Sequence, residues 1–323
     1  MNLRKYSSNL VLPTYPGLSK SQQQQLPELI RATALPAMFS DSTHQLWDCE
    51  TLDGSLIVKI CQQENITHSA FWQAMESLFG VNLPAQLGGF AAVYKTLSAF
   101  SPLVIPEYIA SGFASKNEQA FIATKKVPGT LPTPATIKPA VVASLAEHIA
   151  GLHRQSITRW GQIEQPQFTP QQWPQRLRDS LRILAGHHGD IPATVLAEAL
   201  KSVEFCGAKE FVPIMPDLRW DQFLLLNGKL SALVDLDAFV FAPRELELVL
   251  LEYLLDEQQA QTFIQRYQQT LAMPDLSAVR KPYRLLLFLM NVLAEKNLKC
   301  WMHAPSRFFQ YPSGGGEFLP ERI

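Results

Sequence analysis

The chain has 323 residues, of which 47% are hydrophobic and 18% charged, enough to bury one large core or two modest ones. Its formal charge of -1 comes with scattered Lys and Arg, which excludes nucleic acid as an expected partner. The basic N-terminal segment lacks a continuous apolar core, so we expect no secretory signal. The longest apolar run, near Leu285–Leu289, reaches about half of the ~20 residues that span a bilayer, so no membrane contact is expected. The four cysteines form no CxxC pair, which indicates reduced thiols in a cytoplasmic protein without a zinc site.

The first half of the chain predicts a small mixed lobe. Residues 1–37 are expected to be an N-terminal extension that ends in a short amphipathic segment at 26–35. Two β-like runs then meet at Asp53-Gly54, a strong hairpin signal. Helices are expected at 68–80 and 89–100, and further strands within 102–113 and 118–127. Val127-Pro128-Gly129-Thr130 interrupts the pattern, which predicts one domain over 38–127 and a second over 128–323.

The second half predicts a larger, mainly helical lobe. A helix with one apolar face runs from about 141 to 155, and a Pro-rich stretch delays the next helix to Arg176. β-like runs gather only between 210 and 239, where Asn227-Gly228 signals a tight hairpin. The remaining helices are expected at 244–257, 260–271 and about 278–303. The predicted fold class is therefore α+β, with a small N-terminal sheet, a hinge, a helical lobe and a ligand cleft between the lobes.

Residues 215–239 carry the chemistry. Asp217 opens a polar loop, Gln222 follows five positions later, and the second strand of the hairpin ends on Asp235 and Asp237. Because a hairpin returns its far end to its starting point, Asp217, Gln222 and Asp235 should converge there. Oxygen-bearing side chains gathered in this way suit Mg²⁺, which also binds waters and substrate phosphates. Phosphoryl transfer needs little more than that metal, positioning, and an acid that orients the incoming hydroxyl.

This stretch resembles the aminoglycoside phosphotransferase and choline kinase family. The family signature is a His-Gly-Asp loop, an Asn five residues after the Asp, and a second Asp eighteen residues after it. Here those positions hold Asp217, Gln222 and Asp235 with the spacing intact. The segments DLDAFVFAPRELELVLLEYLL, LAEHIAGLHRQ and AFIATKKVPGTLP are similar to other family stretches, and the likeness covers roughly residues 40–270. It implies a protein kinase-like fold of two lobes.

The resemblance also implies an ATP- and Mg²⁺-dependent phosphotransferase that acts on a hydroxyl of an unidentified small molecule. Asp217 is then the catalytic base, and Lys59 holds the ATP phosphates. The metal would be bound by Asp235 together with Gln222 or Asp237. In the loop 39–43, the hydroxyls of Ser40 and Ser42 would contact the phosphates, and the backbone from Lys125 to Val127 would bind the adenine. Glu245, Glu252 or Asp256 could meet a cationic acceptor, and Glu76 is the candidate acidic partner of Lys59.

Some positions depart from the family pattern and keep a second hypothesis open. Met215-Pro216 replaces His-Gly, Gln222 is one methylene longer than Asn, and the loop 39–43 has no glycine. These changes favour a pseudokinase, a nucleotide-binding or regulatory module with little transfer activity. A third hypothesis is a helical scaffold that binds no nucleotide.

Individual residues also have simpler interpretations. Asp217 could cap a turn, Asp235 could be a buried hydrogen-bonded acid, and Lys59 could be an ordinary exposed lysine on a strand. His153, at the end of its helix, is expected to brace the catalytic loop rather than to titrate in catalysis.

Overall fold

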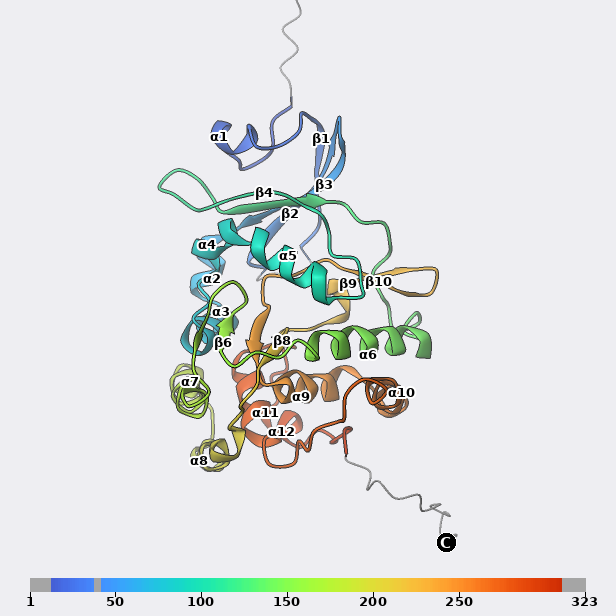
Figure 1. The fold of residues 1–323 in the computed structure, drawn as a ribbon. Helices are drawn as coiled ribbons and strands as arrows, with labels where there is room; N and C mark the ends of the chain where they lie inside the picture. The colour runs from blue at the N-terminus through green and yellow to red at the C-terminus, as the bar shows by residue number, and fades with distance from the viewer. Residues whose placement is uncertain (1–12, 38–41, 310–323) are drawn as a thin grey trace, which may run out of the picture.

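A computed structural model describes residues 13–37 and 42–309 of the chain. The described residues form two lobes, with an antiparallel sheet in the N-terminal lobe and a larger, mainly helical C-terminal lobe below it (Figure 1). This arrangement confirms the predicted α+β architecture. No helix of the described part is long and apolar enough to cross a membrane.

The N-terminal sheet has five antiparallel strands in the order β1-β2-β3-β5-β4. Its strands are β1 Leu29–Ala34, β2 His44–Thr51, β3 Gly54–Cys61, β4 Tyr108–Gly112 and β5 Phe121–Lys125. The predicted hairpin at Asp53-Gly54 joins β2 to β3, and Gly54 has a φ of 113° that favours glycine. β1 lies inside the region expected to be an extension. There the sequence predicted an amphipathic segment, whereas the structure pairs it with β2 as an edge strand.

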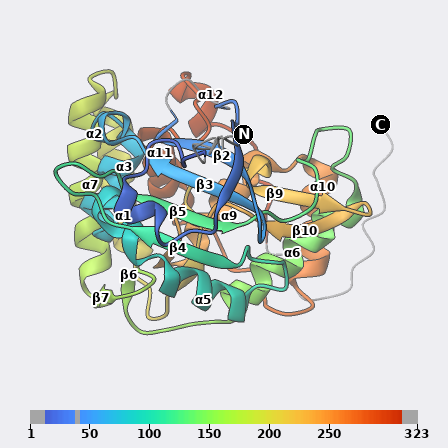
Figure 2. The ribbon, with the colours of Figure 1, turned by 90° about the horizontal axis from the view of Figure 1, so that it is seen from above.

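Residues 13–28 cover the outer face of this sheet. The short helix α1 (Lys20–Gln23) lies across the top of the lobe (Figures 1 and 2). Tyr15 and Leu18 join a buried cluster with Val58, Ile60 and Phe121 of the sheet. Val58 and Ile60 thus point to the outer face. Because successive side chains of a strand point to opposite faces, Lys59 between them points toward the helical lobe.

Short helices connect β3 to β4. They are α2 Gln63–Thr67, α3 Ala70–Ala74, α4 Leu83–Gln86 and α5 Ala91–Phe100. A single π-helical turn, Met75–Phe79, continues α3 and ends at Gly80 in the left-handed conformation, so the helix predicted at 68–80 is present but irregular.

The C-terminal lobe is built from helices and a small sheet. The helices are α6 Pro139–His153, α7 Gln172–His188, α8 Ala193–Ser202, α9 Arg244–Leu254, α10 Glu257–Tyr267, α11 Arg280–Leu289 and α12 Leu298–Met302. Four short strands pair in the order β7-β6-β11-β8: β6 Trp160–Gln162, β7 Pro166–Phe168, β8 Val212–Ile214 and β11 Val240–Ala242.

Two expectations about these helices were wrong. The helix predicted from Arg176 begins at Gln172, because Pro174 occupies the first turn, where a missing N–H costs little. The long helix predicted at 278–303 is interrupted after Leu289, and Asn291 and Ala294 both adopt a φ of 56°.

The predicted hairpin at Asn227-Gly228 is confirmed as β9 (Phe223–Leu226) and β10 (Lys229–Leu233). Asn227 and Gly228 have φ values of 53° and 74°, the positive values that a tight two-residue turn requires. Isolated bridges join β10 to Val104, which lies between α5 and β4 of the N-terminal lobe, and β9 to Thr130, which lies in the segment that leads to the helical lobe.

Candidate active site

Lys59 of β3 connects the sheet to the helical lobe. Its Nζ lies 2.8 Å from Oδ1 of Asp235 and 2.8 Å from Oδ2 of Asp237, just beyond the end of β10. The side chain is buried, so the expectation of an exposed strand lysine was wrong. Glu76, the expected acidic partner, is itself exposed, and the two aspartates take that place.

Lys59, Asp235 and Asp237 shift one another's pKa values. Burial lowers the pKa of Lys59, but the charges of Asp235 and Asp237 outweigh it and raise the pKa above its usual range. Burial raises the pKa of Asp235, yet the charge and hydrogen bond of Lys59 bring it down to about 2. For Asp237 burial prevails, and the pKa rises to about 6. The contact with Lys59 thus governs the pKa of Asp235, whereas burial governs that of Asp237.

His44, the first residue of β2, lies against the same cluster. Its Nε2 is 3.3 Å from Oδ2 of Asp237, without the alignment of a hydrogen bond, and its Nδ1 is 3.1 Å from the Thr43 hydroxyl. Burial, together with the charge of Lys59, lowers the pKa of His44 to about 3. The ring is therefore neutral at physiological pH. Nothing in the local sequence marks this residue as part of a site, and it was not predicted.

Asp217 follows β8 in the loop that leads to β9. Its Oδ1 is buried without a hydrogen-bond partner among the described residues, and its Oδ2 lies 4.0 Å from Arg219. Burial raises the pKa of Asp217 to about 7, against the lowering effect of Arg219 and with a further rise from the charge of Asp235. A carboxylate poised near neutrality is suited to exchanging a proton with a substrate hydroxyl.

Gln222 holds the loop of Asp217 in shape. The N–H of Arg219 donates to its Oε1 at 2.7 Å, and its Nε2 donates to the carbonyl of Asp217 at 3.1 Å. The side chain is buried. Both ends of the amide therefore contact the backbone of the loop itself.

Glu247 of α9 supports the beginning of the same loop. Its Oε1 accepts the N–H of Met215 at 2.7 Å, and its Oε2 lies 2.9 Å from Nε2 of His153. The Tyr267 hydroxyl bonds the other ring nitrogen of His153. His153 thus braces the loop through Glu247. Glu247 was not predicted as a site residue, although a glutamate flanked by leucines in an apolar helix is a local signal for it.

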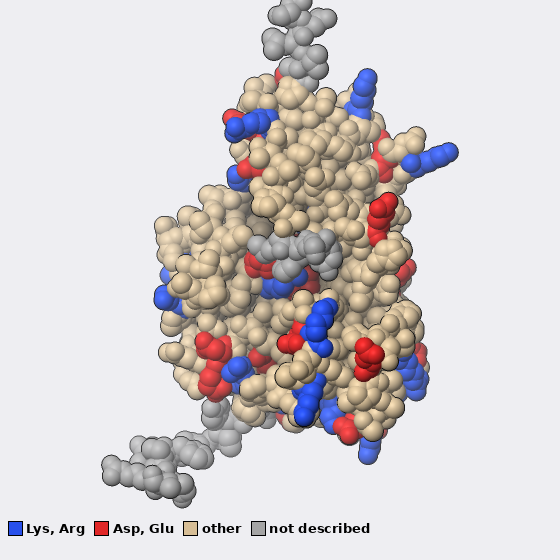
Figure 3. Space-filling model, turned by 180° about the vertical axis from the view of Figure 1, so that it is seen from behind, with Lys and Arg blue, Asp and Glu red and all other residues tan. Residues whose placement is uncertain are grey.

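A cavity of about 510 Å³ brings the predicted acids together. Asp217, Asp235 and Asp237 all line it, together with Ser42 and His44. Seen from behind the view of Figure 1, acidic and basic side chains lie close together where the two lobes meet (Figure 3).

Of the other predicted positions, Ser42 lines this cavity, whereas Lys125 and Val127 are not among its lining residues. Ser42 Oγ donates to the carbonyl of His44, whereas Ser40 falls outside the described residues. The N–H of Lys125 donates to the carbonyl of Glu107, and its side chain pairs with Glu107 at the surface. No described residue accepts a hydrogen bond from the N–H of Val127.

The acids fit a magnesium ion. The described residues contain no group of three or more His, Cys, Asp or Glu arranged to hold a metal by themselves. Mg²⁺, however, is usually bound by one or two carboxylates together with waters and substrate phosphates. The buried Oδ1 atoms of Asp217 and Asp237 lack protein partners among these residues, and the Asp235 side chain is 36% exposed toward the cavity. Unpaired carboxylate oxygens of this kind are suited to a divalent cation.

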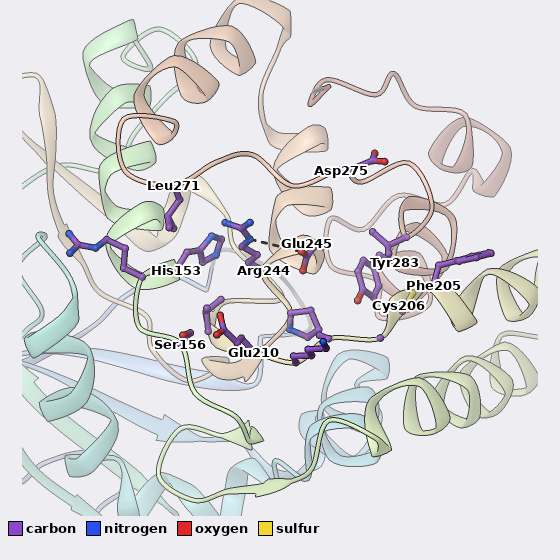
Figure 4. A pocket seen from close by; sticks show the side chains of 17 residues that line it. His153, Ser156, Phe205, Cys206, Glu210, Arg244, Glu245, Leu271, Asp275 and Tyr283 are labelled. Carbon is purple, nitrogen blue, oxygen red and sulfur yellow. Dashed lines mark ion pairs between the residues drawn. The ribbon is translucent and has the colours of Figure 1, made fainter. Parts of the chain in front are cut away.

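A larger cavity of about 820 Å³ lies elsewhere in the helical lobe (Figure 4). Arg244, Glu245 and Tyr283 line it, whereas none of the three predicted aspartates does.

The acids expected to meet a cationic acceptor are placed away from the smaller cavity. Glu252 is buried against Arg280 and Arg284, Asp256 caps α10, and Glu245 lines the larger cavity. None of the three lines the smaller cavity.

Comparison with known proteins places this arrangement in a family. Solved structures share the fold, including a macrolide 2′-phosphotransferase from Brachybacterium faecium (13% identity, 88% of this chain and 97% of that one, TM-score 0.54). A putative fructosamine-3-kinase from Haemophilus somnus has 14% identity, covers 87% of this chain and 92% of its own, and gives a TM-score of 0.56. An aminoglycoside phosphotransferase solved with GDP and kanamycin has 14% identity, with coverage of 84% and 87% and a TM-score of 0.53.

These likenesses confirm the protein kinase-like fold predicted from the sequence. No curated protein sequence matches the chain. The model of the phosphotransferase enzyme family matches residues 36–282, which span both lobes and every acid of the cavity. The chain therefore belongs to the phosphotransferase enzyme family.

Proposed function

We propose that the protein is a cytoplasmic, ATP-dependent enzyme that transfers the γ-phosphoryl group to a hydroxyl of a small molecule. The observation that carries this proposal is the meeting of Lys59, from the N-terminal sheet, with Asp235 and Asp237, from the helical lobe, beside Asp217. A cation and several carboxylates at the junction of two lobes provide what phosphoryl transfer requires.

Each side chain has a role in this proposal. Mg²⁺ bound at Asp235, with Asp237 or Gln222, would neutralise charge on the phosphates. Lys59 would turn from its aspartate partners toward the phosphate oxygens. The acceptor hydroxyl would attack the γ-phosphorus, the bond to the ADP oxygen would break, and the hydroxyl proton would pass to Asp217. The pKa of Asp217, about 7, suits that proton transfer.

The nucleotide would lie under the sheet. The N–H of Val127, with the neighbouring backbone of Lys125, would take the adenine, and the hydroxyls of Ser40 and Ser42 would face the phosphates. Support for this part comes from the position of Ser42 at the cavity wall and from the place of Val127 two residues after the end of β5.

The test separates nucleotide binding from transfer. Mg-ATP should raise the melting temperature of the protein, and Asp235→Asn should remove most of that rise. The exposed surface variant Asp179→Asn, on α7, serves as the matched control. ADP release over a panel of sugars, alcohols and amines then measures turnover. Stabilisation by Mg-ATP without turnover of any member would identify a pseudokinase, and no stabilisation at all would refute the proposal.

A further inference from the structure

The carboxylate of Asp237 depends on Lys59 for its hydrogen bond. Its Oδ2 accepts from Nζ of Lys59 at 2.8 Å, and its Oδ1 has no partner among the described residues. Only 4% of the Asp237 side chain is exposed. In the proposed function Lys59 turns toward the nucleotide phosphates, which leaves Oδ2 without this donor. Because a buried carboxylate without hydrogen bonds is costly, Asp237 needs a second donor at that stage.

His44 is the side chain placed to supply that donor. Its Nε2 lies 3.3 Å from the same Oδ2 that Lys59 contacts. Only 10% of the His44 side chain is exposed, and the residue lines the same cavity as Asp237. Nε2 is buried and makes no hydrogen bond within the described part of the chain. At this distance a small rotation of the ring or of the carboxylate is enough to align one.

Two neighbours of His44 indicate which ring nitrogen carries the hydrogen. Nε1 of Trp72, on α3, donates to Oγ1 of Thr43 at 3.3 Å, and this hydroxyl lies 3.1 Å from Nδ1 of His44. An indole nitrogen is a donor only, so the hydroxyl accepts from Trp72 and its own hydrogen is available to Nδ1. A neutral imidazole whose Nδ1 accepts carries its hydrogen on Nε2. The other tautomer would direct the lone pair of Nε2 at a carboxylate oxygen, which is repulsive.

We propose that His44 is a positioning residue that replaces Lys59 as the hydrogen-bond donor to Asp237 when the lysine turns to the phosphates. Trp72 and Thr43 hold the ring in the tautomer that this exchange requires. Loss of a hydrogen bond to a carboxylate beside a metal typically costs about 10–100-fold in metal affinity or activity. The proposal rests on the proposed function, since that function moves Lys59 away from Asp237.

The first test determines the tautomer of His44 without nucleotide or metal. The full chain is labelled with ¹⁵N-histidine, and a spectrum at pH 8 correlates the ring nitrogens with the carbon-bound ring hydrogens. The signals of His44 are those that disappear in His44→Gln. We expect the hydrogen on Nε2 and a bare Nδ1. A hydrogen on Nδ1 would overturn the proposal.

The second test measures whether His44 and Lys59 substitute for each other. His44→Leu is made in the unmodified protein and in a Lys59→Met background, where the ammonium group is absent. Urea denaturation at pH 8 should show a larger fall in the midpoint in the Lys59→Met background, because His44 is there the remaining partner of Asp237. An equal fall in both backgrounds would show that His44 does not replace the lysine.

The third test follows the Mg²⁺ concentration at which ATP stabilises the protein half-maximally against heat. His44→Leu should raise this concentration about 10–100-fold. His44→Gln keeps an N–H donor of similar reach and should stay close to the unmodified protein. His187→Leu, which makes the first substitution at an exposed histidine of α7, is the control and should change nothing. Equal shifts for His44→Leu and His44→Gln would assign His44 a merely structural role and refute the proposal.

The three tests separate this proposal from the proposed function. Absence of any stabilisation by Mg-ATP in the unmodified protein would refute phosphotransfer. The tautomer and the urea cycle involve no nucleotide, so they still decide whether His44 is the alternative donor to Asp237.

Discussion

Lys59 and Asp235 are joined by a 2.8 Å contact between Nζ and Oδ1 although 176 positions separate them in the sequence. The lysine belongs to β3 of the N-terminal sheet, and the aspartate follows β10 in the helical lobe. Together with Asp237, this contact ties the two lobes to each other across the cavity. In the proposed function, Lys59 exchanges these contacts for contacts with the nucleotide phosphates, which would link the geometry of the cavity to nucleotide binding.

Replacement of Lys59 by alanine should impair transfer. We expect kcat/KM for ATP to fall by about 10²–10³-fold, the usual effect of removing one donor to a developing negative charge. The assay is ADP release at saturating acceptor. Lys281→Ala, which removes an exposed lysine paired with Glu198, is the control and should leave the rate unchanged. A Lys59→Ala protein with undiminished activity would remove Lys59 from the site.

The rate should depend on the ionisation of Asp217. Burial raises the pKa of this group to about 7, and only its ionised form accepts a proton. We therefore expect kcat/KM for the acceptor to rise about tenfold per pH unit below about 7 and to level off above it. An activity profile from pH 5.5 to 9 measures this, and a rate independent of pH below 7 would contradict the role of Asp217 as base.

The raised pKa of Asp217 also predicts that replacing this residue stabilises the fold even though it abolishes transfer. A carboxyl group whose pKa is raised by folding binds its proton more tightly in the folded state, so its ionisation destabilises the fold as pH rises from about 4 to about 7. Asp217→Asn should therefore abolish transfer yet raise the free energy of unfolding at pH 8 by an amount on the order of 2–4 kcal/mol. Urea denaturation at pH 5 and pH 8 measures the difference, which should be smaller at pH 5.

Glu247 should be essential for the loop of Asp217. Glu247→Ala leaves the Met215 N–H and His153 without their partners in a fully buried position. Loss of such contacts costs on the order of 3–5 kcal/mol, and we expect a matching fall in the urea midpoint and in activity. Glu245→Ala, on the same helix but partly exposed, is the matched control. Equal stability of the two variants would show that Glu247 does not brace the loop.

Local signals in the sequence predicted much of the fold. Asp53-Gly54 and Asn227-Gly228 located both hairpins because tight turns demand positive φ, a constraint carried by the residues themselves. The spacing of Asp217 and Asp235 around the second hairpin predicted a shared site, and both line one cavity.

What the sequence did not reveal depends on distant contacts. The partners of Lys59 lie in another lobe, and no local pattern encodes a pairing across that distance. Residues 29–34 form a strand because β2 offers a free edge, which outweighs the amphipathic pattern of the segment. The interruption after Leu289 also has no proline or glycine to announce it, since Asn291 and Ala294 make the turn.

Gln222 offers a test of how far this loop follows the family pattern. The family has asparagine at this position, so Gln222→Asn restores the family residue and shortens the side chain by one methylene. In this structure, Oε1 of Gln222 accepts the Arg219 N–H and its Nε2 donates to the carbonyl of Asp217. The shorter amide cannot keep both contacts without moving the backbone that carries Asp217, and a shift of about 1 Å can cost about 10²-fold in rate.

We therefore expect Gln222→Asn to lower kcat, on the order of tenfold to a hundredfold, rather than to improve it. Stabilisation by Mg-ATP should change little, because Asp235 and Lys59 are left in place. Gln222→Glu supplies the comparison: it keeps the length and the acceptor oxygen but loses the donor to Asp217. If Gln222→Asn instead raises kcat, then Gln222 acts chiefly on the metal, as the family pattern implies, and its two backbone contacts are secondary.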